Sequence, residues 1–298
     1  IESLLNFDFV RNLRNQNIDV ALSIDWFEGQ VFDKSWSLAF HSFYPKVTIV
    51  GYRPNHSFST YLCSFPIPIE REAKCLPDEI AIQGQGSFKS LIEFFPKLGV
   101  RIIPSFKSAY VWNFDYKYST KKNIALVTLP ISISMSMEII NKIHSAKVSL
   151  KIDDKNSPFI IKPHPTHDVK LIKEIVKNID LKIQVTEVKS LPTLLNTTSV
   201  LLTEASSSCL EALSCGIPVI VIVNSGGLSY NPVPKSVPSK IYSNAETIDD
   251  IVYALKLFLN RDISMFEELN EIGKKIRNDF FEPITQKGIN QFLKKNIK

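Results

Sequence analysis

One stretch of the chain, Thr203–Ile222, constrains the fold more than any other. The residues Ser199–Thr203 are short, apolar and rich in branched side chains, which is typical of a buried strand. Cys209–Ser214 has the composition of a helix, Gly216 follows where a helix usually ends, and Val219–Val223 is a second buried strand. Strand, short helix and strand together predict a βαβ unit, the building block of parallel sheets.

Three consecutive serines, Ser206, Ser207 and Ser208, separate the first strand from the short helix. They are therefore expected at the carboxyl edge of the sheet, where open α/β sheets bind ligands. A helix N-terminus offers free N–H groups and a partial positive charge, which favour an anion. One serine would suffice to cap the helix, so three hydroxyl groups favour a phosphate site.

Composition places the chain among globular proteins and excludes several other classes. Its 298 residues suit two α/β domains, and it is 44% hydrophobic and 22% charged. The net charge of +5 is spread along the chain and does not indicate nucleic-acid binding. The four cysteines lack metal-ligand spacing, which favours reduced thiols in a cytoplasmic protein. No apolar run is long enough to cross a bilayer, and the start at Ile1 suggests that N-terminal sequence is missing.

The first half of the chain alternates strands with helices, which predicts a small Rossmann-like domain over residues 1–115. Asp25 and Glu28 follow the first of these strands, and Glu28 lies between aromatic residues in a loop at the carboxyl edge. Glu28 is the candidate acid or base, and Asp25 is a weaker one. The strands are predicted at residues 17–24, 46–52, 78–84 and 100–104, and the helices at 31–43 and 87–95.

A polar and aromatic segment, residues 112–123, is predicted to connect the first domain to a second one over residues 116–285, with a C-terminal helix and tail at 286–298. The closing helix is expected to pack back across the first domain. Strands are predicted at 124–129, 159–161, 182–186, 199–203 and 219–223, and helices at 136–144, 169–179, 191–196, 209–214, 247–259, 263–279 and 286–295.

A second motif, Lys162-Pro163-His164-Pro165, ends one of these strands. The two prolines stop the strand and stiffen the loop, so Lys162 and His164 are held at the sheet edge. A fixed imidazole can donate a hydrogen bond to a phosphate oxygen or a base, and a lysine adds positive charge. The motif predicts a second part of the same anion site.

Two other patterns are weaker. Asp153 and Asp154 are flanked by Lys151 and Lys155, which predicts a surface loop, and no metal site is expected. Gly84-Gln85-Gly86 is an incomplete dinucleotide fingerprint.

Taken together, these motifs resemble those of GT-B glycosyltransferases, which have two Rossmann-like domains facing each other across a cleft. The His-Pro and Ser-Ser motifs are similar to those of bacterial sialyltransferases, polysialyltransferases and Kdo transferases, which use CMP-activated sugars. The likeness extends to capsule and lipopolysaccharide biosynthesis proteins and covers nearly the whole chain. It rests further on residues 26–30, 50–52, 76–78, 211–219 and 280–283.

This resemblance implies a role for each motif residue. His164, with Lys162 and Pro165, would contact the CMP moiety, and Ser206, Ser207 and Ser208 would hold its phosphate. Glu211 would bind the ribose or sugar of the donor. The family carries a paired-acid and glycine motif whose acid is the general base. Here Phe27-Glu28-Gly29 keeps the acid and the glycine but has Phe27 in place of the first acid.

The function implied is transfer of a Kdo-like or sialic-acid-like sugar from a CMP-sugar to a surface glycan, without a metal or other cofactor. The acceptor would be a glycan or lipid-linked glycan, so association with the inner face of the membrane is compatible with a cytoplasmic enzyme. Glu28 would serve an inverting reaction, whereas Asp25, Glu28 and Asp78 are alternative nucleophiles for a retaining one. Of these, Asp78 is expected to shape a turn instead.

Three alternatives stay open. A glycerophosphotransferase using CDP-glycerol carries similar motifs, although it usually has Thr-Asp-Tyr before the serines where this chain has Thr203-Glu204-Ala205. A nucleotide-sugar epimerase shares the domain plan. A non-catalytic module that binds nucleotide or glycan in a larger synthase is the third.

Overall fold

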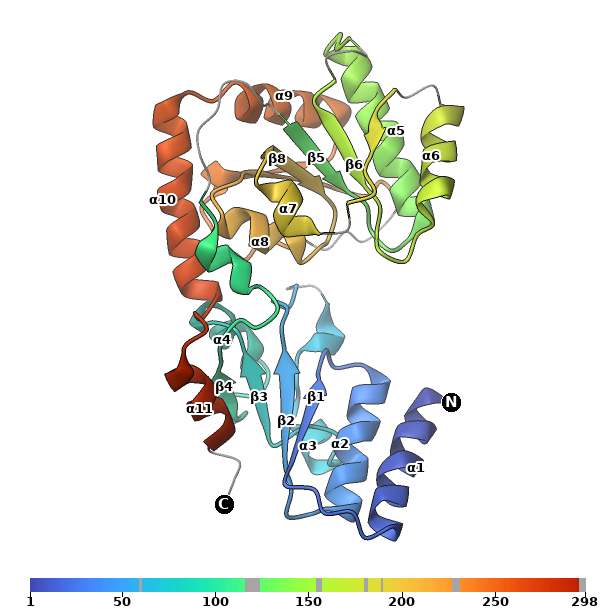
Figure 1. Ribbon diagram of the computed structural model, residues 1–298, viewed down its shortest axis with the longest axis vertical. Coiled ribbons are helices and arrows are strands. Elements are labelled where there is room, and N and C mark those ends of the chain that lie inside the picture. Colours follow the sequence, from blue (N-terminus) through green and yellow to red (C-terminus); the bar gives the residue numbers. More distant parts are fainter. Residues whose placement is uncertain are drawn as a thin grey trace. The chain divides into compact units, whose positions relative to one another are not determined.

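A computed structural model describes residues 1–58, 61–115, 124–153, 157–179, 182–188, 190–226 and 231–294 of the chain. The chain divides into two compact units (Figure 1). Unit 1 contains residues 1–109 and 278–298, and unit 2 contains residues 110–277. Each unit has its own parallel sheet with helices packed on it, which confirms the α/β class predicted from the sequence.

The sheet of unit 1 has four parallel strands in the order β1-β2-β3-β4, which is also their order in the chain. Each strand is followed by a loop at the same edge, the carboxyl edge, because all four run in one direction. The strands are β1 (Leu22–Trp26), β2 (Thr48–Arg53), β3 (Glu79–Ile82) and β4 (Val100–Ile102). The helices are α1 (Glu2–Asn15), α2 (Val31–Phe43), α3 (Pro68–Glu72), α4 (Phe88–Leu91) and α11 (Gln286–Lys294).

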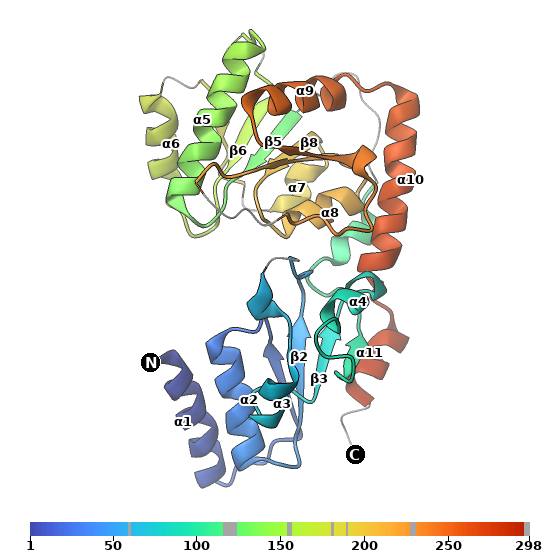
Figure 2. The ribbon, with the colours of Figure 1, turned by 180° about the vertical axis from the view of Figure 1, so that it is seen from behind.

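Alternate side chains of these strands enter cores on opposite faces of the sheet, as the two-residue period of a strand requires. Val50 and Ala81 pack with Phe292 of α11 on one face. Ile49 packs with residues of α1 and α2 on the other face, and Ile80 and Ile82 pack there with Leu91 of α4. The helices therefore cover both faces of the sheet (Figures 1 and 2).

The C-terminal segment completes unit 1, so the unit boundaries differ from the ranges 1–115 and 116–285 expected from the sequence. The N–H group of Glu282 donates to the carbonyl of Gln83 at 2.5 Å, and the N–H group of Ser105 donates to the carbonyl of Glu282 at 2.9 Å. A backbone pairing between residues so far apart in the chain leaves no local pattern in the sequence. The predicted return of the closing helix to the first domain agrees with the place of α11 in unit 1.

The sheet of unit 2 has six parallel strands in the order β10-β9-β8-β5-β6-β7. The chain starts at β5, adds β6 and β7 on one side, and then adds β8, β9 and β10 on the other. The strands are β5 (Ile124–Thr128), β6 (Phe159–Lys162), β7 (Gln184–Val185), β8 (Thr198–Thr203), β9 (Val219–Ile222) and β10 (Tyr242–Ala245). Such a reversal of strand order makes a topological switch point between β5 and β8.

Helices cover both faces of this sheet as well. One face packs against α5 (Ile133–Ser149), α6 (Val169–Asn178) and α9 (Ile248–Leu259) in a single apolar core. The helices α7 (Leu191–Leu195) and α8 (Ser208–Ser214) lie on the other side (Figure 2). The helix α10 (Ile263–Phe280) runs from unit 2 into unit 1.

Most predicted elements are confirmed, and the differences are at their ends. The first strand begins at Leu22 rather than at residue 17, because the preceding residues follow helix α1, which the sequence reading did not include. The helix expected over 87–95 is a short 3-10 turn followed by α4. β10 and α3 were not predicted. Residues 116–123 of the predicted connection, Asp154 of the acid pair and residues 295–298 of the tail lie outside the described ranges.

None of the helices in the described ranges has the length and apolar character that a bilayer crossing requires.

Candidate functional site

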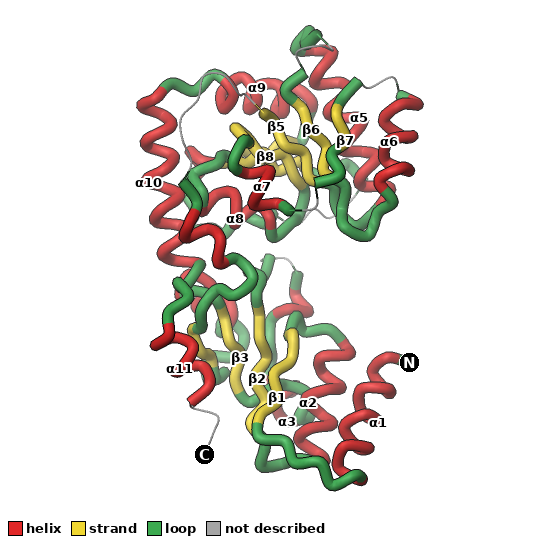
Figure 3. Tube along the Cα trace, viewed as in Figure 1, coloured by secondary structure: helices red, strands yellow, loops and turns green. Residues whose placement is uncertain are grey.

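The carboxyl edge of the unit 2 sheet brings the two sequence motifs onto neighbouring strands. The serines follow β8, and His164 follows β6, with β5 between these two strands. The first turns of α5 and α8 follow β5 and β8 at the switch point (Figure 3). Open α/β sheets bind ligands at this point, so the fold places both motifs where a ligand is expected.

The serine loop is held in one shape by its own hydroxyl groups. The Oγ atoms of Ser206 and Ser208 are 2.8 Å apart, and the Ser208 N–H group donates to Ser206 Oγ at 3.3 Å. Ser207 occupies the N-cap position of α8, but its side chain does not cap the helix. Ser208 is buried, whereas Ser206 and Ser207 are half-buried. The loop thus presents hydroxyl groups beyond those that capping requires.

His164 is held with one ring nitrogen fixed. The N–H group of Thr166 donates to His164 Nδ1 at 3.3 Å, and Thr166 Oγ1 lies 2.7 Å from the same nitrogen. Burial and the neighbouring charges of His167 and Lys162 lower the pKa of His164, which favours the neutral ring. Since Nδ1 accepts a hydrogen bond, the neutral ring carries its proton on Nε2, and Nε2 is the donor available to a ligand.

The other residues of this motif differ in exposure. Lys162 is 9% exposed, and its Nζ atom lies 3.5 Å from the Pro163 carbonyl. Burial lowers the pKa of Lys162. Pro165 is exposed. Lys162 therefore carries a desolvated charge next to His164.

Glu211 lies on α8 and contacts the start of unit 2. It is 8% exposed, and the Tyr110 hydroxyl group donates to its Oε2 atom at 3.1 Å. Burial and the charge of Glu211 raise the pKa of Tyr110. The resemblance implied that Glu211 binds the sugar or ribose of the donor, and that role stays a prediction.

Sequence reasoning missed an ionic cluster at the same switch point. Glu138 Oε1 accepts from Lys142 Nζ on the next turn of α5, and from both the N–H and the Oγ–H groups of Ser225, each at 2.8 Å. Lys142 Nζ also donates to the Val223 carbonyl at 2.5 Å. Glu204, directly after β8, is 6% exposed, and burial together with Glu138 raises its pKa. The signal available in the sequence was an acid immediately after a buried strand.

In unit 1, Glu28 lies at the carboxyl edge, as predicted, and its carboxylate is oriented by two donors. Glu28 Oε1 accepts from Trp26 Nε1 at 3.0 Å and from Asn55 Nδ2 at 2.9 Å. Asn55 is fixed in turn by Lys107, whose Nζ atom donates to Asn55 Oδ1 at 2.7 Å. One carboxylate oxygen is therefore held by Trp26 and Asn55, which sets the direction of the other.

The backbone around Glu28 is held by Asp33, a fully buried residue of α2 that the sequence reading did not single out. Asp33 Oδ2 accepts from the N–H group of Glu28 at 2.8 Å and from that of Gln30 at 2.9 Å. Gly29 between them has φ +80°, and a Cβ atom there would lie 2.3 Å from the Cys63 carbonyl oxygen. The loop requires glycine at this position both for its φ angle and for its close packing.

The Asp25 side chain is half-buried and lies close enough to Asp33 to interact with its charge. Burial, and then the charge of Asp33, raise the pKa of Asp25 to about 7. Its Oδ2 atom is buried and has no hydrogen-bond partner among the described residues. A carboxyl group in this setting is half protonated near neutral pH.

Two further polar residues, Arg53 and His56, lie in the same part of unit 1. Arg53, the last residue of β2, is 4% exposed, and its Nη2 atom lies 3.5 Å from the Glu28 carbonyl. Burial lowers the pKa of Arg53 to about 10. His56 Nδ1 lies 2.9 Å from Ser87 Oγ, and burial lowers the pKa of His56 to about 4.

Asp78 does not belong to this site. Its Oδ2 atom accepts from the Ile49 N–H group at 2.8 Å, and Asp78 immediately precedes β3, at the amino edge of the sheet. Asp78 therefore shapes a turn, which is the role that the sequence favoured for it over that of a nucleophile. Within the described ranges, no group of three or more histidine, cysteine or acidic side chains is arranged to hold a metal ion.

Gly84 and Gly86 are explained by packing. A Cβ atom at Gly84 would lie 2.3 Å from the Phe280 backbone carbon, and one at Gly86 would lie 2.7 Å from the Phe280 ring. Because neither glycine has a side chain, the C-terminal segment around Phe280 can pack closely against both of them.

No protein-family model matches the chain, and no curated protein matches it. Solved structures do match it over nearly its whole length. MnaA from S. aureus, in a co-structure with UDP, is 15% identical with a TM-score of 0.66, and the match covers 99% of this chain and 82% of that one. A UDP-forming α,α-trehalose-phosphate synthase from Burkholderia xenovorans is 11% identical with a TM-score of 0.60, covering 99% and 78%.

A third match is the UDP-GlcNAc 2-epimerase of Methanocaldococcus jannaschii in complex with UDP-GlcNAc and UDP. It is 13% identical with a TM-score of 0.57, and the match covers 91% of this chain and 78% of that one. At these identities the likeness shows the fold. The chain therefore has the GT-B type of fold, with two Rossmann-like units, that its sequence predicted.

Proposed function

We propose that this protein is a glycosyltransferase that takes its sugar from a nucleotide-activated donor bound to unit 2. The observation that carries the proposal is the shared carboxyl edge, where the serine loop after β8 and the fixed imidazole after β6 flank β5. Hydroxyl groups and a neutral imidazole are donors suited to phosphate oxygens. The matched structures support the donor class, since those of MnaA and of the epimerase contain UDP.

Donors fixed in advance around a leaving phosphate lower the barrier to its departure. In the proposal Ser206, Ser207 and Ser208 bind the phosphate, His164 donates from Nε2, and Lys162 supplies positive charge. Pro165 keeps the loop stiff, and Glu211 holds the sugar or ribose of the donor. These groups supply the charge stabilisation that a metal ion supplies in other transferases.

The acceptor hydroxyl group would be activated by Glu28. Its oxygen attacks the anomeric carbon, the bond from that carbon to the phosphate oxygen breaks, and the nucleotide leaves with the electron pair. Glu28 takes the proton of the hydroxyl group, and the single displacement inverts the configuration at the anomeric carbon. The Glu28 carboxylate is suited to this role because Trp26 and Asn55 orient it and Asp33 holds its backbone. Asp25 is assigned no step in this reaction.

The finer form of the proposal is a CMP-linked Kdo-like or sialic-acid-like donor and a surface-glycan acceptor. It rests on the likeness of the two motifs to those of CMP-sugar transferases. A second candidate, an enzyme of the UDP-sugar epimerase type, is favoured by the matches to MnaA and to the epimerase. The identity of the nucleotide tests the CMP assignment, and transfer of the sugar to an acceptor, as opposed to epimerisation of the donor alone, separates the two candidates.

Calorimetric titration of the protein with CMP, CDP, UDP and GDP tests the proposal. We expect CMP to bind, and His164→Ala to weaken binding by about tenfold, because a buried hydrogen bond to a charged group is lost. His144→Ala is the control, since His144 lies in the last turns of α5, away from the carboxyl edge. Preference for UDP would overturn the CMP assignment, and it would be compatible with both a UDP-sugar transferase and the second candidate. Failure of all four nucleotides to bind would overturn the transferase proposal.

A further inference from the structure

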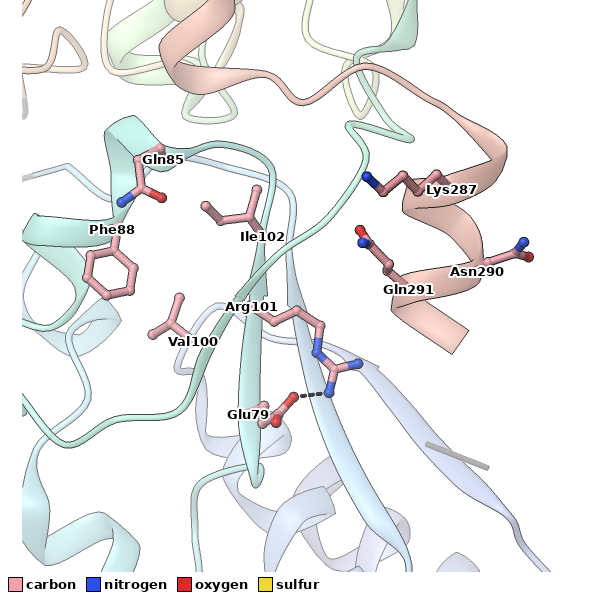
Figure 4. A pocket seen from close by; sticks show the side chains of 9 residues that line it. All are labelled: Glu79, Gln85, Phe88, Val100, Arg101, Ile102, Lys287, Asn290 and Gln291. Atoms are coloured by element: carbon pink, nitrogen blue, oxygen red, sulfur yellow. Dashed lines mark hydrogen bonds and ion pairs between the residues drawn. The ribbon is translucent and has the colours of Figure 1, made fainter. Parts of the chain in front are cut away.

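Unit 1 contains a pocket that no step of the proposed reaction uses. It has a volume of about 1040 Å³ and lies along β4, the edge strand of the sheet. Figure 4 shows Val100, Arg101 and Ile102 of β4 in the middle, with Gln85 and Phe88 on one side and Lys287 and Gln291 of α11 on the other. The pocket is therefore walled by segments that are distant in sequence.

The two elements that form this pocket, β4 and α11, are held together by contacts of Arg101 and Phe292. Arg101 forms an ion pair with Glu79 of the neighbouring strand, and its Nη1 atom donates to the Phe292 carbonyl at 3.0 Å. Phe292 is buried against Val50 and Ala81 under the sheet, which anchors α11. A preformed pocket costs little free energy to organise when a ligand binds.

The polar lining selects a ligand that both donates and accepts hydrogen bonds. Gln85 and Gln291 contribute carboxamide groups, each of which has two donors and an acceptor, whereas Asn290 Oδ1 accepts from Gln286 Nε2 at 3.1 Å. An apolar ligand would strip water from these amides without replacing its hydrogen bonds, which is unfavourable. Sugar hydroxyl groups, which are both donors and acceptors, match them. Phe88, Val100 and Ile102 give apolar surface for the C–H faces of sugar rings.

The charge of the lining selects an acidic saccharide over a neutral one. Arg101 is balanced by Glu79, whereas Lys287 is exposed and forms no ion pair with any described residue. Figure 4 shows the Lys287 ammonium group directed toward β4. The volume is at the upper end of that of small-molecule sites, about 1000 Å³, so more than one sugar ring fits.

We propose that this pocket binds an acidic oligosaccharide chain, with the Lys287 ammonium group on a sugar carboxylate and the Gln85 and Gln291 amides on ring hydroxyl groups. The inference rests on the proposed function only in naming this chain as part of the acceptor. A site along the edge strand would hold the growing glycan apart from the reacting end, which lets one enzyme accept chains of different length.

Direct binding tests this proposal without nucleotide or turnover. The probes are a linear trimer of α2,8-linked sialic acid and maltotriose, which has the same number of rings and no charge. Each is titrated into the full chain and followed by saturation-transfer NMR and calorimetry. We expect the acidic trimer to bind at millimolar concentration or below, and maltotriose to bind about tenfold more weakly, since it lacks the charge-assisted hydrogen bond.

Variants locate the binding. Lys287→Ala and Gln291→Ala should each weaken binding of the acidic trimer, and Lys287→Ala should also abolish the preference over maltotriose. Lys46→Ala is the matched control, because Lys46 is an exposed lysine of unit 1 that precedes β2 at the amino edge. Equal binding of the two probes, or binding that survives both variants, would overturn the proposal. Failure of CMP to bind in the separate titration would overturn only the proposed function and leave this result in place.

Discussion

At the scale of the residue, the arrangement around Glu28 distinguishes a reacting group from the groups that hold it. One oxygen of Glu28 is held by Trp26 and Asn55, and its backbone N–H group is held by Asp33. Removal of the charge should therefore affect the reaction more than the fold.

We predict that Glu28→Gln lowers the turnover number by about a hundredfold or more, the usual contribution of a positioned general base. CMP affinity should be unchanged, because Glu28 belongs to unit 1 and the nucleotide residues to unit 2. Initial rates and calorimetry on the same preparation measure both quantities. Asp8→Asn, a half-buried acid paired with Arg11 on α1, is the control. Retained turnover in Glu28→Gln would remove Glu28 from the mechanism.

Asp25 yields a prediction about pH. Its pKa is raised to about 7 in the folded protein from 3.8, so the folded state binds the proton more tightly than the unfolded state. Its contribution to stability is thus largest at low pH and falls as the pH rises from about 4 to about 7. Asp25→Asn, which cannot ionise, should raise the free energy of unfolding at pH 8 by about 2–3 kcal/mol relative to its effect at pH 5.

Urea unfolding followed by tryptophan fluorescence at the two pH values measures this effect, and Trp26 lies next to the substituted residue. Asp19→Asn, outside the strand, serves as the control. An effect of Asp25→Asn that is the same at pH 5 and pH 8 would contradict the raised pKa.

At the scale of the element, short-range patterns were sufficient for most helices and strands. The helix over residues 31–43 was predicted with the bounds that it has, because its apolar residues repeat with helical spacing. The β8-α8-β9 unit is confirmed as adjacent parallel strands. In both cases the local sequence is sufficient to predict the helix or the βαβ unit.

Contacts between distant segments could not be predicted in this way. Nothing near Glu211 in the sequence indicates Tyr110, and nothing near Glu28 indicates Asn55. The serines and His164 were recognised because each follows a buried strand. Glu204, Asp33 and Arg53 were missed because their importance comes from burial and from charges that other elements bring to them.

The glycine after β3 gives a prediction at this scale. A Cβ atom at Gly84 would meet backbone atoms of Asp279 and Phe280 at 2.3–2.6 Å, and backbone cannot move aside as a flexible side chain does. Gly84→Ala should therefore reduce the free energy of unfolding by about 2–3 kcal/mol, the range of overpacking and strain. Gly226→Ala is the control, since among the described residues its Cβ atom would meet only Asn224 Oδ1, at 3.3 Å. Equal urea midpoints for the two variants would contradict this packing role.

At the scale of the whole molecule, the two units differ in how the chain builds them. Unit 2 is continuous in sequence, whereas unit 1 needs the C-terminal segment that follows it. Phe292 fills the core of unit 1, and Glu282 joins its backbone to Gln83 and Ser105. Unit 1 is therefore completed only when the last residues of the chain are present.

The two ends of unit 2 are held together. Arg277 Nη1 donates to the Val111 carbonyl at 2.8 Å, and the Arg277 guanidinium group lies 5.3 Å from the centre of the Trp112 ring. The Tyr110 hydroxyl group donates a hydrogen bond to Glu211 within the same unit. With its own six-stranded sheet, its own apolar core and joined ends, unit 2 has the features of a domain that folds alone.

We predict that residues 110–277, expressed alone, unfold cooperatively and bind the same nucleotide as the full chain, with an affinity within about threefold, a difference of less than 1 kcal/mol. Calorimetry on the fragment and the full chain, with His164→Ala in each, measures this. Residues 1–109 alone are the contrasting fragment, which should fail to unfold cooperatively because Phe280, Glu282 and Phe292 are missing from its core and sheet edge. A folded unit 2 that binds no nucleotide while the full chain does would mean that unit 1 contributes essential contacts to the donor, and would move part of the nucleotide site away from the serine loop and His164.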